Sequence, residues 1–483
     1  MNAIHAADIH FGRIEKRQMR RVQEVFFVGI GGVGMSAIAE VLMNMGYRVS
    51  GSDMKASANT ERLVARGATV YIGHRGENVE NASVVVTSSA IDTRNPEVAR
   101  ARELGIPVIR RAEMLAELMR FRFGIAVAGT HGKTTTTSLV ASMLSDAGLD
   151  PTFVIGGVLT AAGSNARLGE GQYLVAEADE SDASFWHLQP MISIVTNIDA
   201  DHLENYGGSF ATLKEGFVRF LHNLPFYGLA VMCVDDPGVQ AVLPDVGRPL
   251  RTYGFSEQAE MRALNVRQQG LQMHFDVYDR DRDETFAAVL NMPGRHNVLN
   301  ALAAIIVAEE LGLDRDTIVH GLLHFKGVGR RFTYHGRIRH ASGSADIFED
   351  YGHHPSEIRA VLHAAKEGFA GRRIFAVFQP HRFTRTRDLL DEFAEVLADC
   401  EALVLTDVYS AGEAEIVGAD SKALARAIRA HGRVEPLLIA EREEVNARLA
   451  DDLLADGDVV IYFGAGDIGR QARLMGEQYG EGA

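Results

Sequence analysis

A glycine-rich segment carries the residue types that bind phosphate: Gly129-Thr130-His131-Gly132-Lys133-Thr134-Thr135-Thr136-Thr137. It follows the apolar run 124–128 and precedes the helical pattern 138–147. A glycine turn between a strand and a helix directs backbone N–H groups at one spot, where an ammonium and a hydroxyl can hold phosphates and Mg²⁺. The strict P-loop pattern has glycine where this chain has Val127, so the match is partial. We expect residues 129–135 to bind ATP with Mg²⁺, or Mn²⁺ in its place; the alternative is a glycine turn with a solvated lysine.

A second glycine cluster, Gly29-Ile30-Gly31-Gly32-Val33-Gly34, follows a short apolar strand and precedes a helical pattern. It fits G-x-G-x-x-G, and Asp53 follows the next predicted strand, an order typical of dinucleotide sites. The motif indicates only that a pyrophosphate can approach the backbone at a helix N-terminus, and a UDP-sugar carries a pyrophosphate as NAD does. NAD is the less favoured alternative, because a dehydrogenase seldom needs a second nucleotide site.

Carboxylates and a histidine follow two predicted strands near the phosphate loop. Strand 173–176 runs into the acidic segment 177–182, and strand 192–197 leads to Asp199, Asp201 and His202. Hard cations take oxygen ligands and bridge the phosphates of ATP, so these acids are candidate Mg²⁺ ligands. A solvated acidic loop is the alternative in a chain this acidic.

Two asparagines, Asn297 and Asn300, share one face at the start of a predicted helix over 298–311. An asparagine amide is both donor and acceptor, which suits an adenine edge. Helix capping is the alternative for Asn297.

Three arginines, Arg382, Arg385 and Arg387, follow the predicted strand 374–378. At the carboxyl end of a parallel strand they form a local anion site, although arginines also build structural ion pairs.

The motifs 329–332 and 350–355 lie on either side of a predicted domain boundary, where closure on a ligand is commonly organised.

The apolar patterns predict three α/β domains in series, over residues 1–122, 123–335 and 336–483. The first and third are expected to be Rossmann-like, with buried strands alternating with helices. The central domain combines the phosphate loop with antiparallel strands at 271–278 and 285–290. In the third domain, strands are expected at 374–378, 402–406, 436–439 and 459–463, with helices at 389–397, 421–431 and 443–454.

Composition restricts the class of partner. The 483 residues include 49 Lys and Arg against 64 Asp and Glu, a net charge of -15 that repels nucleic acid and anionic membranes in bulk. Anions must therefore be bound by local sites. No apolar run is long enough to span a membrane, and the only cysteines, Cys233 and Cys400, are far apart, so we expect a cytoplasmic protein with reduced thiols.

Taken together, these motifs resemble the Mur ligase family, and the likeness runs from Phe26 to about Gly466. The resemblance implies an N-terminal UDP-binding domain, a central ATPase domain and a C-terminal domain that brings the amino acid. The most similar branch joins L-alanine to the lactyl carboxylate of UDP-N-acetylmuramate through an acyl-phosphate, giving ADP and phosphate in a cytoplasmic step of peptidoglycan synthesis.

The resemblance also implies roles for individual residues. Those expected to hold the UDP-sugar are Gly31, Gly32, Gly34, Ser52, Ser88 and Ser89. Those expected to act on ATP are Lys133 for the phosphates, Thr134 and Glu177 for one Mg²⁺, His202 for a second, Asn297 and Asn300 for adenine, and Arg331 and Asp350 for closure on the nucleotide. Those expected to orient alanine and the acyl-phosphate are His353, Arg382 and Arg385.

The chain departs from the wider family at one position. Many relatives carry a carbamylated lysine about fifteen residues after the histidine that matches His202, whereas that count reaches Phe217 here, with Lys214 out of register. We therefore expect no carbamylation. Other hypotheses are a ligase that attaches a whole peptide to UDP-N-acetylmuramate, a nicotinamide dehydrogenase and a nucleotide-binding regulator without chemistry.

Overall fold

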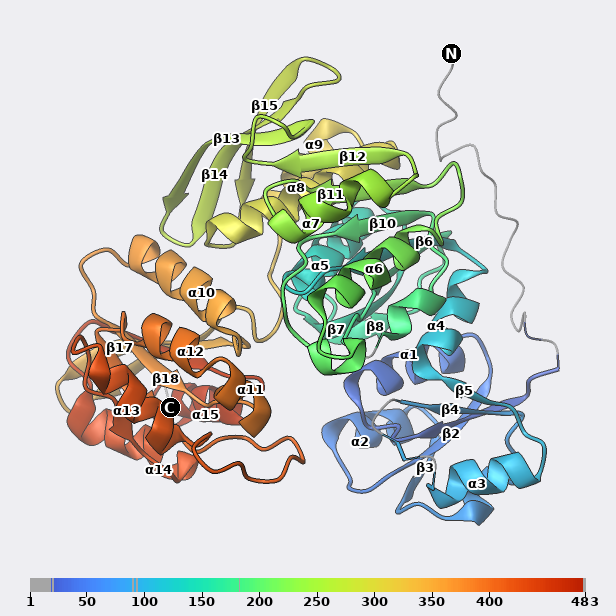
Figure 1. The fold of residues 1–483 in the computed structure, drawn as a ribbon, viewed down its shortest axis with the longest axis horizontal. Helices are drawn as coiled ribbons and strands as arrows, with labels where there is room; N and C mark the ends of the chain where they lie inside the picture. Colours follow the sequence, from blue (N-terminus) through green and yellow to red (C-terminus); the bar gives the residue numbers. More distant parts are fainter. Residues whose placement is uncertain (1–18, 20, 89–90, 93, 182, 481–483) are drawn as a thin grey trace. The chain divides into compact units, whose positions relative to one another are not determined.

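The computed structural model describes residues 19, 21–88, 91–92, 94–181 and 183–480. Their packing divides the chain into two compact units. The first contains residues 1–266, 275–290 and 297–326, and the second contains residues 267–274, 291–296 and 327–483. Figure 1 shows three sheets: the first sheet and most of the second belong to the first unit, and the third belongs to the second unit.

The first sheet is parallel and has the order β3-β2-β1-β4-β5. Its strands are β1 (Glu24–Val28), β2 (Arg48–Asp53), β3 (Thr69–Ile72), β4 (Val84–Thr87) and β5 (Val108–Arg110). Its helices are α1 (Val33–Asn44), α2 (Ala58–Ala65), α3 (Pro96–Glu103) and α4 (Arg111–Met119). Strands β2 and β3 lie on one side of β1, and β4 and β5 lie on its other side. In α/β sheets the ligand crevice opens at such a reversal of strand order, which here falls after β1, where the first glycine cluster lies.

The second sheet is mixed and has ten strands in the order β15-β14-β13-β12-β11-β10-β6-β9-β7-β8. The strands on its phosphate-loop side are β6 (Phe123–Ala128), β7 (Thr152–Leu159), β8 (Ser164–Arg167), β9 (Tyr173–Glu177) and β10 (Ile192–Val195). The others are β11 (Leu229–Cys233), β12 (Leu250–Gly254), β13 (Met261–Gln269), β14 (Gln272–Asp279) and β15 (Glu284–Leu290). The helices are α5 (Lys133–Asp146), α6 (Phe210–Leu221), α7 (Pro237–Val242), α8 (Arg295–Glu310) and α9 (Arg315–Leu323).

The third sheet has the order β16-β17-β21-β18-β19-β20. Its strands are β16 (Thr333–His340), β17 (Gly343–Asp350), β18 (Ile374–Phe378), β19 (Ala402–Leu405), β20 (Leu437–Leu438) and β21 (Asp458–Phe463). Its helices are α10 (Pro355–Gly368), α11 (Phe383–Asp388), α12 (Leu390–Leu397), α13 (Ser421–Ala430), α14 (Arg442–Arg448) and α15 (Ile468–Tyr479). The pairing of β16 with β17 is antiparallel, and the other pairings are parallel.

The predicted α/β fold class is confirmed, and the structure adds elements that the patterns did not predict. The β16–β17 hairpin was not predicted, because β16 is only partly buried and mixes polar with apolar residues. Helix α11 was not predicted, because the arginine-rich segment 383–388 has no apolar periodicity. The predicted helix 443–454 is divided into α14 and a π-helical turn, Leu449–Leu453.

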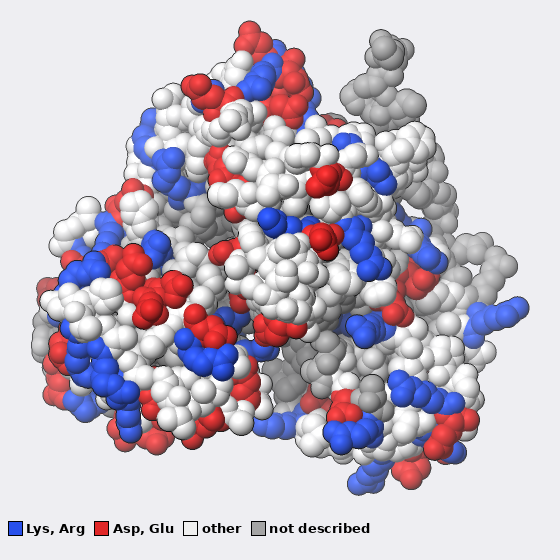
Figure 2. All heavy atoms as spheres, in the orientation of Figure 1, with Lys and Arg blue, Asp and Glu red and all other residues white. Residues whose placement is uncertain are grey.

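Buried apolar side chains cover the parallel strands of each sheet, whereas β13, β14 and β15 alternate buried with more exposed residues, as the antiparallel pattern predicted for β14 and β15. Acidic and basic side chains are interspersed over the face drawn in Figure 2. None of the helices in the described part of the chain combines the length and the apolar character needed to cross a bilayer.

The aromatic cluster beneath α6 predicts a large loss of stability on truncation. Phe217 is fully buried, and its ring packs edge-on against Phe185 with centroids 5.2 Å apart. We expect Phe217→Ala to lower the free energy of unfolding by about 3–5 kcal/mol, because the cavity cannot close completely. Phe226, which is 84% exposed, provides the matched control: Phe226→Ala should stay within about 0.5 kcal/mol of the parent protein in urea denaturation. Equal effects of the two substitutions would contradict the burial of Phe217.

Candidate active site

The phosphate loop joins β6 to α5, and its shape requires glycine. Gly132 has a φ of +82°, in the left-handed region that side chains rarely adopt. A Cβ at this position would also lie 2.6 Å from Oδ1 of Asn300. Two hydrogen bonds join the loop to the residues that follow β10. The backbone N–H of His131 donates to Oδ1 of Asn197 (2.7 Å), and the Thr196 hydroxyl donates to the His131 carbonyl (2.6 Å). Sequence reasoning assigned no role to Thr196 or Asn197.

Lys133, the first residue of α5, is partly buried, and oxygen atoms surround its ammonium group. Its Nζ lies 2.6 Å from the Gly129 carbonyl, 3.0 Å from the Thr130 carbonyl and 2.8 Å from a carboxylate oxygen of Glu180. Burial acts to lower the pKa of Lys133, but the nearby carboxylates, Glu180 first, outweigh it and raise that pKa. The loop therefore keeps a charged ammonium where phosphates are expected.

Glu180 is the partner that sequence reasoning missed. Its side chain is only 1% exposed, and burial raises its pKa to about 7 although the Lys133 ammonium acts in the opposite direction. The residue belongs to the acidic segment after β9, but nothing in that segment's composition distinguished it from its neighbours. Only its contact with Lys133, which lies 47 residues earlier in the sequence, identifies it.

Glu177, at the end of β9, fits the role of a metal ligand. Burial raises the pKa of its carboxyl group, and a hydrogen bond with the side chain of Thr134 acts to lower it. Its Oε1 is buried and has no hydrogen-bond partner among the described residues. A hydroxyl beside an unsatisfied carboxylate oxygen is the donor chemistry that a hard cation such as Mg²⁺ prefers.

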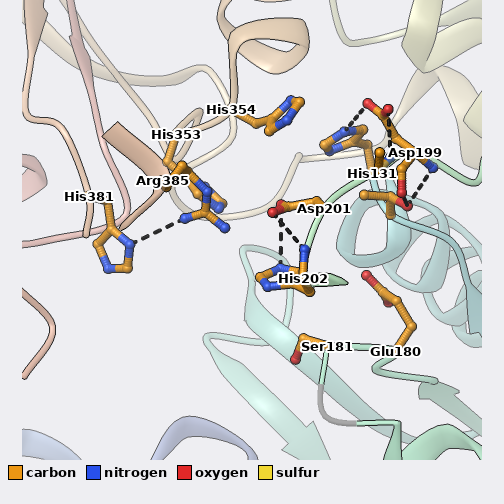
Figure 3. A network of polar contacts seen from close by, with 12 residues as sticks. His131, Glu180, Ser181, Asp199, Asp201, His202, His353, His354, His381 and Arg385 are labelled. Atoms are coloured by element: carbon orange, nitrogen blue, oxygen red, sulfur yellow. Dashed lines mark hydrogen bonds and ion pairs between the residues drawn. The ribbon is translucent and has the colours of Figure 1, made fainter. Parts of the chain in front are cut away.

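His202 lies in the loop that follows β10 and has a φ of +57°. Its Nε2 is 3.4 Å from Oδ2 of Asp201, and Figure 3 shows this pair on the segment that also carries Asp199. Glu180 and Ser181 lie on the neighbouring segment in the same view. The two strand ends thus bring together the acids and the histidine that sequence analysis grouped. Their roles as metal ligands stay predictions.

Asn297 and Asn300 are buried in the first two turns of α8. The Asn300 amide donates to Oδ1 of Asn297 (3.1 Å), and Asn300 lies against Gly132 of the phosphate loop. Helix α8 begins at Arg295, so Asn297 is inside the helix and the capping alternative is wrong. The adenine contact stays a prediction.

A cavity of about 350 Å³ opens beside the first glycine cluster, within the first unit. Gly32, Gly34, Ser88 and Arg111 line it from the first sheet's elements, and Glu177 and Asp179 line it from the acidic segment. The predicted sugar-nucleotide loop and Glu177, one of the predicted metal ligands, therefore line the same cavity.

Two other predicted contacts of the UDP-sugar, Gly31 and Ser52, form hydrogen bonds with residues of the protein. The Gly31 N–H donates to Oδ2 of Asp53 (2.9 Å), so it is fastened to the end of β2. The Ser52 hydroxyl is buried and donates to Oε2 of Glu97 (2.6 Å), with Nδ1 of His74 at 2.9 Å. The structure thus gives Ser52 partners within the protein. Ser89 lies outside the described residues.

In the second unit, Asp350 ends β17 and organises the segment around Arg331. Its carboxylate accepts hydrogen bonds from the N–H groups of Phe332 (2.9 Å) and Gly352 (2.7 Å). Burial raises the pKa of Asp350 to about 6, and the positive charge of Arg331 opposes that rise. Contact of Arg331 and Asp350 with a nucleotide stays a prediction.

Positive groups gather after β18 in the same unit. Arg382 has a φ of +71°, and its N–H donates to the Tyr409 carbonyl (2.8 Å). Arg385 is mostly buried, with Nη1 3.5 Å from Nδ1 of His381 (Figure 3). Burial lowers the pKa of His381 to about 3, and the charges of His353, Arg385 and Arg382 act in the same direction. The arrangement is suited to an anionic group such as a carboxylate.

Comparison with known proteins identifies the family. The Mur ligase family catalytic domain matches residues 24–123, the Mur ligase middle domain matches 127–308, and the Mur ligase glutamate ligase domain matches 330–466. The chain belongs to the Mur ligase family. The resemblance read from the motifs is therefore confirmed.

Individual relatives agree with this assignment. The chain is 73% identical over 470 residues to the UDP-N-acetylmuramate–L-alanine ligase of Dichelobacter nodosus, covering 97% of this chain and 98% of that protein. The crystal structure of the UDP-N-acetylmuramate–alanine ligase of Thermotoga maritima has 30% identity and a TM-score of 0.80, with 95% of this chain and 99% of that chain covered. A murein peptide ligase from Psychrobacter arcticus shares the fold, at 24% identity and a TM-score of 0.70, with 94% and 98% covered.

The raised pKa of Glu180 predicts a pH-dependent cost to stability. Its folded-state pKa of about 7 exceeds the ordinary value of 4.5, so the folded state binds more protons between these values and the cost of the buried charge grows as pH rises through them. In urea denaturation from pH 4.5 to pH 8, we expect Glu180→Gln to gain stability relative to the parent protein as pH rises. Glu257→Gln, at a side chain 93% exposed, is the control and should show no such trend. A pH-independent difference for Glu180→Gln would contradict the assignment.

Proposed function

We propose that this chain joins L-alanine to the lactyl carboxylate of UDP-N-acetylmuramate, with conversion of ATP to ADP and phosphate. The observation that carries the proposal is the shared cavity, where the first glycine cluster faces the acidic segment beside the phosphate loop. A carboxylate on a uridine nucleotide bound there would lie near a nucleotide bound at Lys133. The 73% identity to a protein of that name supports the same reaction.

The reaction we propose has two steps. The lactyl carboxylate attacks the γ-phosphorus of ATP, so that an acyl-phosphate forms and ADP leaves. The neutral amine of alanine then attacks the acyl carbon, a tetrahedral intermediate forms, and phosphate departs with the C–O bonding electrons while the amine loses its proton. The first step depends chiefly on positioning and on stabilisation of charge spread over the phosphoryl oxygens.

The residues of the chain supply these requirements in the proposal. Lys133 holds the phosphates with a charge that its carboxylate neighbours maintain. Thr134, Glu177 and His202 would hold Mg²⁺, which neutralises charge on the phosphates when bound. His353, Arg382 and Arg385 would receive the carboxylate of alanine, because guanidinium groups match carboxylates in a paired geometry. Phe217 stands at the sequence count where many relatives carry a carbamylated lysine, and its ring is fully buried, so we propose that the reaction needs no such group.

A phosphate-release assay tests the proposal directly. ATP, MgCl₂ and UDP-N-acetylmuramate are supplied with L-alanine, glycine, L-serine or a tripeptide in turn, and the amide product is identified by mass spectrometry. We expect turnover with L-alanine and a loss of at least about 3 kcal/mol of transition-state stabilisation in Lys133→Ala. Lys422→Ala, at an exposed lysine of α13, should behave as the parent protein. Turnover only with the tripeptide would indicate a peptide-recycling ligase, and neither ADP nor amide would overturn the proposal.

Arg382 provides a second prediction, on use of the amino acid. We expect Arg382→Ala to raise the KM for alanine much more than the Kd for ATP, because the guanidinium group is assigned to the amino-acid step. Steady-state kinetics with alanine and calorimetry with ATP measure the two effects separately. A weaker ATP affinity with unchanged alanine kinetics would contradict this role.

A further inference from the structure

Arg111, the first residue of α4, lines the cavity beside the first glycine cluster and was not among the predicted site residues. Its side chain is 19% exposed, so the guanidinium group is held within the fold and still reaches the cavity. The group covers Gly34 in the first turn of α1. A Cβ at Gly34 would lie 3.1 Å from Nη1 and 3.2 Å from Cδ of Arg111, closer than most side chains approach.

The present partner of Arg111 is a single carboxylate. Nη2 lies 3.5 Å from Oδ2 of Asp179, at the outer limit of a hydrogen bond. Asp179 is also held by the Ser181 N–H (3.0 Å), and the charges of Lys133 and Arg111 help to keep its pKa low although burial opposes them. An arginine side chain has five N–H donors, and this long contact to one carboxylate oxygen involves only one of its nitrogen atoms.

The charges around the cavity require a cation if an anionic ligand is to enter. Among the described residues that line it, Glu177 and Asp179 are acidic and Arg111 is the only cation. A pyrophosphate brought against two carboxylates without a counter-charge would be repelled. Arg111 lies against Asp179 and against Gly34 in the N-terminal turn of α1, where a helix favours anions.

The other G-x-G-x-x-G sequence of the chain, at residues 464–469, shows the contrast. There the N–H of Ile468 at the start of α15 donates to Oε1 of Gln379 (3.2 Å). Nη2 of Arg330 donates to the carbonyls of Gly464 (2.8 Å) and Gly466 (3.0 Å). Protein groups therefore occupy the second loop, whereas Arg111 at the first loop faces a cavity.

We propose that Arg111 is a substrate contact that binds the pyrophosphate of the uridine nucleotide and exchanges its long contact with Asp179 for that bond. The inference rests on the proposed function for the identity of the nucleotide. A guanidinium fork matches two oxygens of adjacent phosphates, which a lysine ammonium cannot reproduce. The lactyl carboxylate is the other oxyanion that such a ligand carries, and the experiment separates the two.

Calorimetric binding to the full chain tests the assignment with four ligands: uridine, UDP, UDP-N-acetylglucosamine and UDP-N-acetylmuramate. We expect Arg111→Gln to weaken the three diphosphates alike, by about tenfold or more, and to leave uridine unchanged. Arg111→Lys should recover part of the affinity. The control is Arg110→Gln, at the exposed neighbour that ends β5, and it should bind all four ligands within about twofold of the parent protein.

Each other outcome has a defined meaning. Unchanged affinity for UDP in Arg111→Gln, with an unchanged melting temperature, would overturn the inference. A loss confined to UDP-N-acetylmuramate would also overturn it, since the guanidinium would then meet the lactyl carboxylate that UDP-N-acetylglucosamine lacks. A parent protein that binds UDP through Arg111 but forms no amide would overturn the proposed function and leave this contact standing.

Discussion

Placement of a charged ammonium inside the fold is the constraint on which the candidate active site depends. A buried lysine loses its charge unless anions and dipoles compensate for the lost water. Here Glu180 and two backbone carbonyls of the loop surround Nζ of Lys133, so the cation is kept. Burial raises the pKa values of Glu177 and Glu180, and the nearby charge of Asp179 acts in the same direction.

Parallel strands explain how these groups meet. β6, β9 and β10 are adjacent in the second sheet and run in the same direction, so their carboxyl ends deliver Lys133, Glu177 and His202 to one edge. The first sheet uses the same principle, with the glycine cluster at the end of β1 next to its crevice. The first glycine cluster and Glu177, at the end of β9, line one cavity in the first unit.

The second unit contributes a different electrostatic environment. Two arginines and His353 act against protonation of His381, so that cluster carries guanidinium charge and a neutral imidazole ring. The positive φ of Arg382 and its hydrogen bond to Tyr409 fix the backbone from which the arginines extend. Such preorganisation costs backbone strain, which is commonly found at functional positions.

The sequence by itself determined the family, the α/β class and the two glycine loops. These features are local, because a turn that needs glycine, or a strand followed by a helix, can be recognised from the types of neighbouring residues. Only the tertiary structure decided that Glu180 pairs with Lys133, that Ser52 is bonded to Glu97, that Asn297 lies inside α8 and that Arg111 faces the cavity. Those facts depend on strand order and on packing between residues far apart in the chain, which periodicity and spacing do not specify.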